Sequence, residues 1–167
     1  MKFIEILKTA NNYYFVYEYC NGGTLEQEIK QLGHFSEEKA LAYFKELLKA
    51  FRMLIKKNIM HRDVKPSNIL LHNGILKLAD FGFCKPLKDA RDLAQTMLGS
   101  PIYMAPEILN GEVYTMKADI WSLGVVLYEM LFGFCPFEER TIARLISLID
   151  QSTTIEFPSD IKVSKKV

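Results

Sequence analysis

Residues 120–137 constrain the fold most, because this segment is almost wholly apolar and must be kept from water. It is about as long as a membrane span. Glu129 and Pro136 lie inside it, and a carboxylate and a helix-breaking residue both disfavour a bilayer helix. We therefore predict a buried core helix over residues 120–132 and no membrane span.

The rest of the chain has enough apolar residues to surround such a helix. Of its 167 residues, 49% are hydrophobic and 25% are charged, which is typical of one compact globular domain. The net charge of +1 gives no broad positive field, so nucleic acid is not an expected partner. Cys20, Cys84 and Cys135 are far apart and lack the close pairs of a zinc or redox site, which predicts a reducing, cytoplasmic location.

Hydrophobic periodicity predicts a strand near the start and helices after it. Residues 13–19 are rich in aromatics and precede two glycines, a pattern typical of a buried strand that leads into a turn. Ser36 followed by two glutamates and a helical apolar period predicts a helix that begins at Glu37 and closes near Lys56. Residues 142–149 predict a smaller amphipathic helix.

A tight hairpin is predicted between two acidic residues. Residues 68–71 and 75–78 are short apolar runs, and Asn73-Gly74 between them is the dipeptide typical of a two-residue hairpin turn. The hairpin places Asp63 before its first strand and Asp80 after its second strand.

The residues around this hairpin carry polar groups that suit phosphate chemistry. Asp63, Lys65 and Asn68 supply a carboxylate, an ammonium and an amide oxygen within six residues, and Asp80 follows twelve residues later. Hard cations such as Mg²⁺ prefer carboxylate and amide oxygens. The alternative interpretation of Asp63 and Asp80 is a pair of solvated turn acids.

The order of these motifs resembles the eukaryotic protein kinase family, in its serine/threonine branch. The matching segments are His61-Arg62-Asp63 with Lys65 and Asn68, Asp80-Phe81-Gly82, Ala105-Pro106-Glu107, and Asp119-Ile120-Trp121-Ser122-Leu123-Gly124. The resemblance covers essentially the whole chain. Residues 83–87 and 96–107 are similar to the autophagy-initiating subfamily.

The resemblance implies an α+β, protein-kinase-like fold that consists mostly of the helical C-lobe. Residues 1–20 would be the last N-lobe strands and the hinge, and residues 21–167 the C-lobe, incomplete at its end. The family's glycine-rich loop, strand lysine and helix glutamate would precede Met1. Loss of one preorganised donor at a developing charge costs ~3–4 kcal/mol of barrier. We therefore expect the chain alone to bind ATP weakly and to transfer phosphate slowly or not at all.

The resemblance further implies ATP and Mg²⁺ as cofactors and protein serine or threonine hydroxyls as substrates. Asp63 would accept or orient the hydroxyl proton, and Lys65 would add positive charge at the γ-phosphate. Asp80 and Asn68 would each hold a magnesium ion.

The same resemblance assigns an adenine pocket. Tyr17 would lie at its back, Glu18 and Cys20 would offer backbone groups to the base, and Leu70 would form an apolar floor. Packing within a strand core is compatible with these roles.

Two further sets of residues follow from the resemblance. The first is the stacked column that links the lobes of active kinases, with Phe3, His61, Phe81 and Asp119 as its members here.

The second set is regulatory and lies in or near the expected activation loop. Thr96 is the phosphorylation candidate, modified by an upstream kinase or by autophosphorylation, and Arg62 would pair with its phosphate. Ser100 lies in the Gly-Ser-Pro segment that fits the serine/threonine branch.

Two alternative functions fit the sequence less well. A catalytically silent kinase-like module that binds a partner protein has no physical need for Asp63, Asn68 and Asp80 together. Another nucleotide- or metal-binding protein would have to carry four ordered motifs by chance. Thr24 lacks the carboxylate that in some relatives attracts a basic residue, so no arginine-directed preference is expected.

Overall fold

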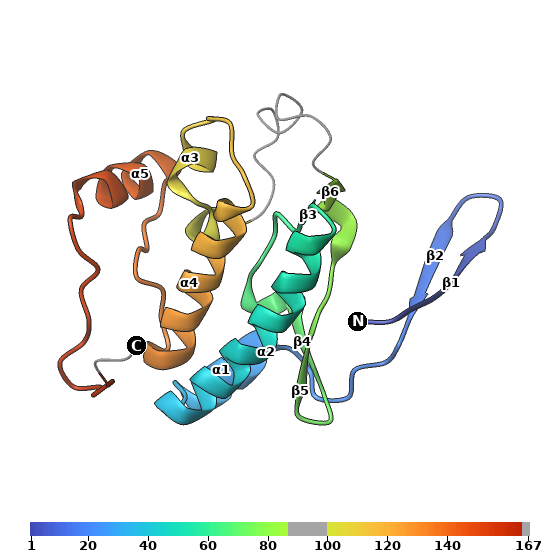
Figure 1. Cartoon of the computed structure of the whole chain (residues 1–167), viewed down its shortest axis with the longest axis horizontal. Coiled ribbons are helices and arrows are strands. Elements are labelled where there is room, and N and C mark those ends of the chain that lie inside the picture. Colours follow the sequence, from blue (N-terminus) through green and yellow to red (C-terminus); the bar gives the residue numbers. More distant parts are fainter. Residues whose placement is uncertain (87–99, 165–167) are drawn as a thin grey trace.

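The computed structural model describes residues 1–86 and 100–164. Two strands at the start, β1 (Phe3–Lys8) and β2 (Tyr13–Tyr17), form an antiparallel hairpin with Lys8 opposite Tyr13. The remaining elements build a mainly helical body, and the hairpin stands away from it (Figure 1). This arrangement matches the expected α+β class.

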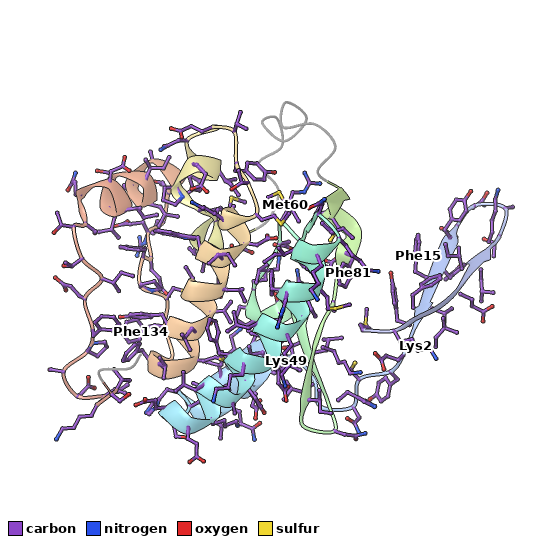
Figure 2. The ribbon with its side chains drawn as sticks, in the orientation of Figure 1. Lys2, Phe15, Lys49, Met60, Phe81 and Phe134 are labelled. Carbon is purple, nitrogen blue, oxygen red and sulfur yellow. The ribbon has the colours of Figure 1, made fainter. Side chains whose placement is uncertain are left out.

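The predicted burial of residues 13–19 is wrong. Tyr13, Phe15 and Tyr19 are 62%, 58% and 82% exposed, and Figure 2 shows Phe15 on the hairpin clear of the helical body. The physical reason is that, in the described part of the chain, β1 and β2 pair only with each other. Aromatic and β-branched residues favoured the strand, but no packed layer covers it.

The two early helices, of which the sequence analysis predicted the second, are each capped by the residue that precedes it. Thr24 caps α1 (Leu25–Leu32) by a capping box with Gln27. Ser36 caps α2 (Glu37–Lys56) by accepting a hydrogen bond from the backbone N–H of Lys39. The predicted start and end of α2 are confirmed.

The predicted hairpin is also confirmed. It consists of β4 (Ile69–His72) and β5 (Ile75–Leu78), paired antiparallel with His72 opposite Ile75. Asn73 and Gly74 have φ values of 51° and 77°, the left-handed conformation that this turn requires. The shorter elements are β3 (Ile59–Met60), which pairs with β6 (Lys85–Pro86), the 3₁₀ turns η1 (Pro66–Asn68), η2 (Phe81–Phe83) and η4 (Pro101–Tyr103), and α3 (Pro106–Leu109).

The apolar segment forms a buried helix, as predicted. This helix, α4 (Lys117–Phe132), begins three residues before the predicted start and packs beside α2 in the core. Residues that form this core include Leu47, Phe51, Leu123, Val126 and Met130. Within residues 1–86 and 100–164, no helix combines the length and apolar composition needed to cross a membrane. The predicted amphipathic helix is α5 (Ile142–Gln151).

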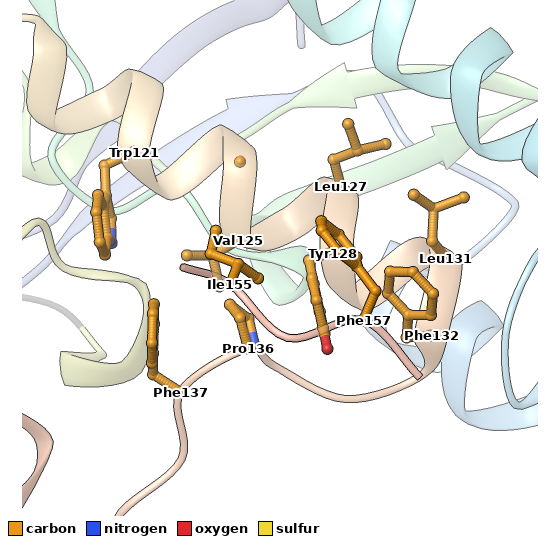
Figure 3. Close-up of a pocket in the computed structure, with 11 residues that line it drawn as sticks. Trp121, Val125, Leu127, Tyr128, Leu131, Phe132, Pro136, Phe137, Ile155 and Phe157 are labelled. Carbon is orange, nitrogen blue, oxygen red and sulfur yellow. The ribbon is translucent and has the colours of Figure 1, made fainter. Parts of the chain in front are cut away.

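Another face of α4 lines an apolar cavity of about 250 Å³. Figure 3 shows Trp121, Tyr128 and Phe132 of α4 around it, together with Phe137 and Phe157 from the chain that follows. The rings of Trp121 and Phe137 are stacked, with centroids 6.1 Å apart. The segment after α5 therefore helps to bury α4, which explains why a helix so apolar is stable in water.

Gly133 ends α4 at a point where the backbone of another element leaves no room. Its φ is +84°, and a Cβ atom there would collide with the carbonyl oxygen of Gly33, which follows α1. We expect Gly133→Ala to lower the free energy of unfolding, measured in urea, by about 2 kcal/mol. Gly111 has a similar φ of +71° but open space around it, so Gly111→Ala should cost only about 1 kcal/mol. Equal losses would contradict the role of this contact.

Candidate active site

Asp63 lies at the centre of a loop between β3 and η1, and two expected partners hold it. Its Oδ2 accepts hydrogen bonds from Lys65 Nζ at 2.9 Å and from Asn68 Nδ2 at 2.7 Å. Asn68 Nδ2 also donates to the backbone carbonyl of Asp63 at 2.9 Å. The structure therefore brings together the carboxylate, the ammonium and the amide that the sequence placed within six residues.

The two carboxylate oxygens of Asp63 differ in their contacts. Asp63 is only 5% exposed, and its Oδ1 has no protein partner among the described residues. In the same residues, His72 Nδ1 is the one buried side-chain nitrogen or oxygen that lacks a hydrogen bond. Asp63 Oδ1 is therefore the oxygen of this carboxylate that no described residue binds.

A backbone hydrogen bond of Ala79, the residue before Asp80, holds Asp80 beside this loop. The N–H of Ala79 donates to the backbone carbonyl of Asn68 at 2.9 Å. Asp80 adopts a left-handed conformation with φ 58°, and its Oδ1 accepts from the N–H of Gly82 at 3.3 Å. The left-handed conformation begins the η2 turn directly after β5.

Asn68 and Asp80 each have a side-chain oxygen of the kind that a hard cation binds. Asn68 donates both amide N–H groups to Asp63, and neither Asn68 Oδ1 nor Asp80 Oδ2 has a protein partner in the described ranges. Within those ranges no cluster of three or more His, Cys, Asp or Glu residues occurs. Mg²⁺ at this place would take further oxygens from water or from nucleotide phosphates.

Asp119, in the first turn of α4, holds the backbone of the loop that carries Asp63, the proposed catalytic loop. Its two carboxylate oxygens accept hydrogen bonds from the N–H groups of His61 at 2.8 Å and Arg62 at 2.9 Å. Arg62 has φ 70°, a conformation that is costly for a residue with a side chain. Burial raises the pKa of Asp119, and the two N–H donors oppose that rise.

His61 is fully buried and is held in one orientation. Its Nε2 lies 2.9 Å from the carbonyl of Ala79, and the N–H of Asp63 donates to its Nδ1 at 3.4 Å, so a neutral ring protonated on Nε2 satisfies both contacts. The ring packs edge-on against Phe81, with centroids 5.2 Å apart. Three members of the expected column, His61, Phe81 and Asp119, are thus in contact.

The fourth expected member lies in the β1–β2 hairpin. Phe3 packs edge-on against Tyr17, with ring centroids 5.7 Å apart. Among the described residues, no ring contact joins Phe3 to Phe81. The column is continuous from Asp119 to Phe81, and its extension to Phe3 stays a prediction.

The burial of His61 predicts a pH dependence of stability. Burial lowers the pKa of its imidazole, so the unfolded chain binds a proton more readily than the folded chain does. Stability is then complete above the unfolded pKa of about 6.5 and is lost as the pH falls below it, by up to about 1.4 kcal/mol per pH unit. Urea unfolding of the wild type and His61→Phe at pH 5 to 8 measures this effect.

The substituted chain should lose less stability than the wild type on acidification. His34→Gln is the control, because it removes a histidine that is not fully buried and should leave the pH dependence in place. The same slope in wild type and His61→Phe would show that another group is responsible.

The expected adenine-binding residues come from three places: the end of β2, the link between the hairpin and α1, and β4. The N–H of Glu18 donates to the carbonyl of Lys2, whereas the carbonyl of Glu18 and the N–H of Cys20 have no backbone partner among the described residues. Leu70, on β4, is half-buried. Tyr17 ends β2 and is 38% exposed. The backbone groups expected to face a base are therefore available.

The expected regulatory residues are only partly described. Arg62 donates from Nε to the carbonyl of Phe83, and Ser100 Oγ accepts from Lys65 Nζ at 3.4 Å. Thr96 lies outside the described residues. Ser100 thus contacts the lysine of the catalytic loop.

The sequence interpretation missed a polar cluster that positions the segment after Ser100. Tyr103 donates from its hydroxyl to Glu129 Oε2 at 2.7 Å, and Ser122 donates to the carbonyl of Tyr103 at 2.7 Å. Cys135 Sγ lies 3.7 Å from the same Glu129 oxygen. Burial raises the pKa of Glu129. Because 26 residues separate Tyr103 from Glu129, no local pattern in the sequence could indicate their contact.

Comparison with known proteins agrees with this geometry. The family model described as "Protein kinase domain" matches residues 1–167. Serine/threonine-protein kinase ATG1b of Arabidopsis thaliana is 39% identical over 164 residues, which cover 96% of this chain and 23% of that protein. Serine/threonine-protein kinase atg1 of Dictyostelium discoideum is 43% identical over 152 residues, which cover 89% of this chain and 22% of that protein.

A human relative gives the same result. Serine/threonine-protein kinase ULK1 of Homo sapiens is 38% identical over 161 residues, which cover 90% of this chain and 15% of that protein. The chain spans less than a quarter of the length of these relatives. The family match over every residue, together with the Asp63, Lys65 and Asn68 cluster, shows that the chain belongs to the protein kinase family.

Proposed function

We propose that the protein is a serine/threonine protein kinase that transfers the γ-phosphate of ATP to serine and threonine hydroxyls of other proteins. The observation that supports this proposal most is the set of hydrogen bonds to the Asp63 carboxylate. Oδ2 is held by Lys65 and Asn68, and Oδ1 accepts no hydrogen bond from the described residues.

Asp63 Oδ1 accepts the proton of the substrate hydroxyl as the hydroxyl oxygen attacks the γ-phosphorus. The bond from phosphorus to the bridging oxygen breaks, and ADP leaves with that oxygen. Lys65, whose ammonium is 2.9 Å from Asp63, balances negative charge on the transferring group. Asn68 fixes the orientation of Asp63 through one hydrogen bond to the carboxylate and one to the backbone carbonyl.

Asn68 Oδ1 and Asp80 Oδ2 would hold Mg²⁺, which neutralises phosphate charge when it is bound. Arg62 fits a regulatory role, because its guanidinium lies beside the catalytic loop and a phosphate on Thr96 would be its partner. Cys20, Cys84 and Cys135 carry free thiols, in keeping with an intracellular location.

The test is a radiolabelled ATP assay of an active preparation of the protein, with a pool of peptides that contain serine, threonine or tyrosine. We expect label on serine and threonine only, and none when Mg²⁺ is chelated. Asp80→Asn should lose transfer at low Mg²⁺ concentration and recover part of it at high concentration, whereas exposed Asp150→Asn should match the wild type. Label on tyrosine, or transfer that ignores Mg²⁺, would contradict the proposal.

A further inference from the structure

The chain that follows the hinge residues Glu18–Cys20 lies along β4 like a third strand. The N–H of Gly22 donates to the carbonyl of Leu71 at 2.9 Å, and the N–H of Leu71 donates to the carbonyl of Gly23 at 2.9 Å. Thr24 continues this pairing as a bridge to Leu70. The backbone next to the hinge is therefore bonded directly to the strand that carries the proposed adenine floor.

The backbone at Gly22 lies so close to β4 that no side chain fits between them. A Cβ atom at position 22 would lie 2.7 Å from the Cβ atom of Leu71, so only glycine fits there without a shift. The chain that follows the hinge is thus in direct backbone contact with β4 at Gly22.

A reciprocal pair of asparagines fastens one end of the hinge to the β4–β5 turn. Asn21 Nδ2 donates to Asn73 Oδ1 at 2.9 Å, and the backbone N–H of Asn73 donates to Asn21 Oδ1 at 3.1 Å. The two residues are 52 positions apart. Both groups of the Asn21 amide are used, which fixes the orientation of its side chain.

An ion pair fastens the other end of the hinge to the same hairpin. Lys77 Nζ, on β5, lies 3.4 Å from Glu18 Oε1, and both side chains are largely covered. Lys77 is directly opposite Leu70 in the β4–β5 ladder. Because an ion pair near the surface adds little to stability or binding, the asparagine pair is the more informative contact to test.

We propose that Asn21 and Asn73 are positioning residues for the nucleotide. They hold the free backbone groups of Glu18 and Cys20 at a fixed distance from Leu70, and so set the height of the slot that takes a purine base. This inference rests on the proposed function and extends it to two residues that touch neither the phosphates nor the reacting hydroxyl.

The test is a titration of the ¹⁵N-labelled 167-residue chain with Mg·ATP, followed by NMR at the amides of the hinge and β4. Asn21→Ala removes both hydrogen bonds, and we expect about a fivefold rise in Kd, which is about 1 kcal/mol. Asn73→Gly removes the 2.9 Å bond to Asn21 and the 3.3 Å contact of Asn73 Nδ2 with His72 Nε2, but it keeps the 3.1 Å bond and the left-handed turn, so its effect should be smaller, about twofold. Asn73→Gly should add nothing in the Asn21→Ala background.

Asn58→Gly is the matched control. Asn58 also has positive φ, at 52°, is exposed, and makes no side-chain hydrogen bond in the described part of the chain. Its Kd should equal that of the wild type. Urea unfolding of each variant checks that it is folded under the conditions of the titration, so that a rise in Kd for Asn21→Ala reports positioning and not unfolding.

Hydrogen exchange without nucleotide is the second measurement. The amides of Gly22 and Leu71 should exchange faster in Asn21→Ala than in Asn58→Gly, which reports the loosened hinge directly. Equal Kd values for wild type and Asn21→Ala, or a Kd that changes only as stability does, would overturn the inference alone. A wild-type chain that binds no Mg·ATP would also overturn this inference alone, because the proposed function is tested separately by the phosphate-transfer assay.

Discussion

Replacing Asp63 by asparagine is expected to lower the rate of phosphoryl transfer by about 10²- to 10⁴-fold, the contribution of a general base. The amide oxygen introduced by Asp63→Asn can still accept from Lys65 and Asn68, so the loop keeps its hydrogen bonds. The outward NH₂ group of the new side chain, however, takes no proton from a hydroxyl. The loss should therefore fall on kcat, with little change in the KM for ATP, when both are measured in an active preparation of the protein.

Asp150→Asn provides the control for this substitution. Asp150 is an exposed carboxylate on α5, far in sequence from the catalytic loop, and its replacement removes the same single negative charge. We expect unchanged kcat and KM. If the protein were a catalytically silent kinase-like module, the wild type would show no transfer, and Asp63→Asn would change nothing. Activity that survives Asp63→Asn would show that another group accepts the proton.

Local signals account for the parts of the fold that the sequence predicted well. Ser36 with its following glutamates marked the start of α2, and Asn73-Gly74 marked the β4–β5 turn, because each signal satisfies backbone groups within a few residues. The exposure of Tyr13 and Phe15 was not predictable in this way. Strand preference is a property of the residue, whereas burial depends on what packs against it.

In the candidate site too, local contacts were predictable from the sequence and long-range contacts were not. Asp63, Lys65 and Asn68 were expected together because they share one short loop, and motif order placed Asp80 after the hairpin. The contact of Lys65 with Ser100 spans 35 residues, so it requires knowledge of the tertiary structure. The contact of Tyr103 with Glu129 is hidden from sequence for the same reason, although it positions the segment next to that serine.

Replacing Asp119 by alanine is expected to produce the largest loss of stability among the substitutions considered, about 3–5 kcal/mol in the free energy of unfolding. The change leaves the N–H groups of His61 and Arg62 without acceptors, and each buried, unsatisfied N–H costs about 1–3 kcal/mol. It also removes the contact that holds Arg62 at φ 70°. Urea unfolding measures the loss.

Two further variants make this prediction specific. Asp119→Asn keeps one oxygen acceptor but turns an NH₂ group toward the other N–H, so its loss should lie between those of the wild type and Asp119→Ala. Asp160→Ala removes an exposed carboxylate and should change stability by less than about 0.5 kcal/mol. Because Asp119 holds the catalytic loop through backbone N–H groups, equal stability of Asp119→Ala and Asp160→Ala would mean that the loop keeps its shape without this carboxylate.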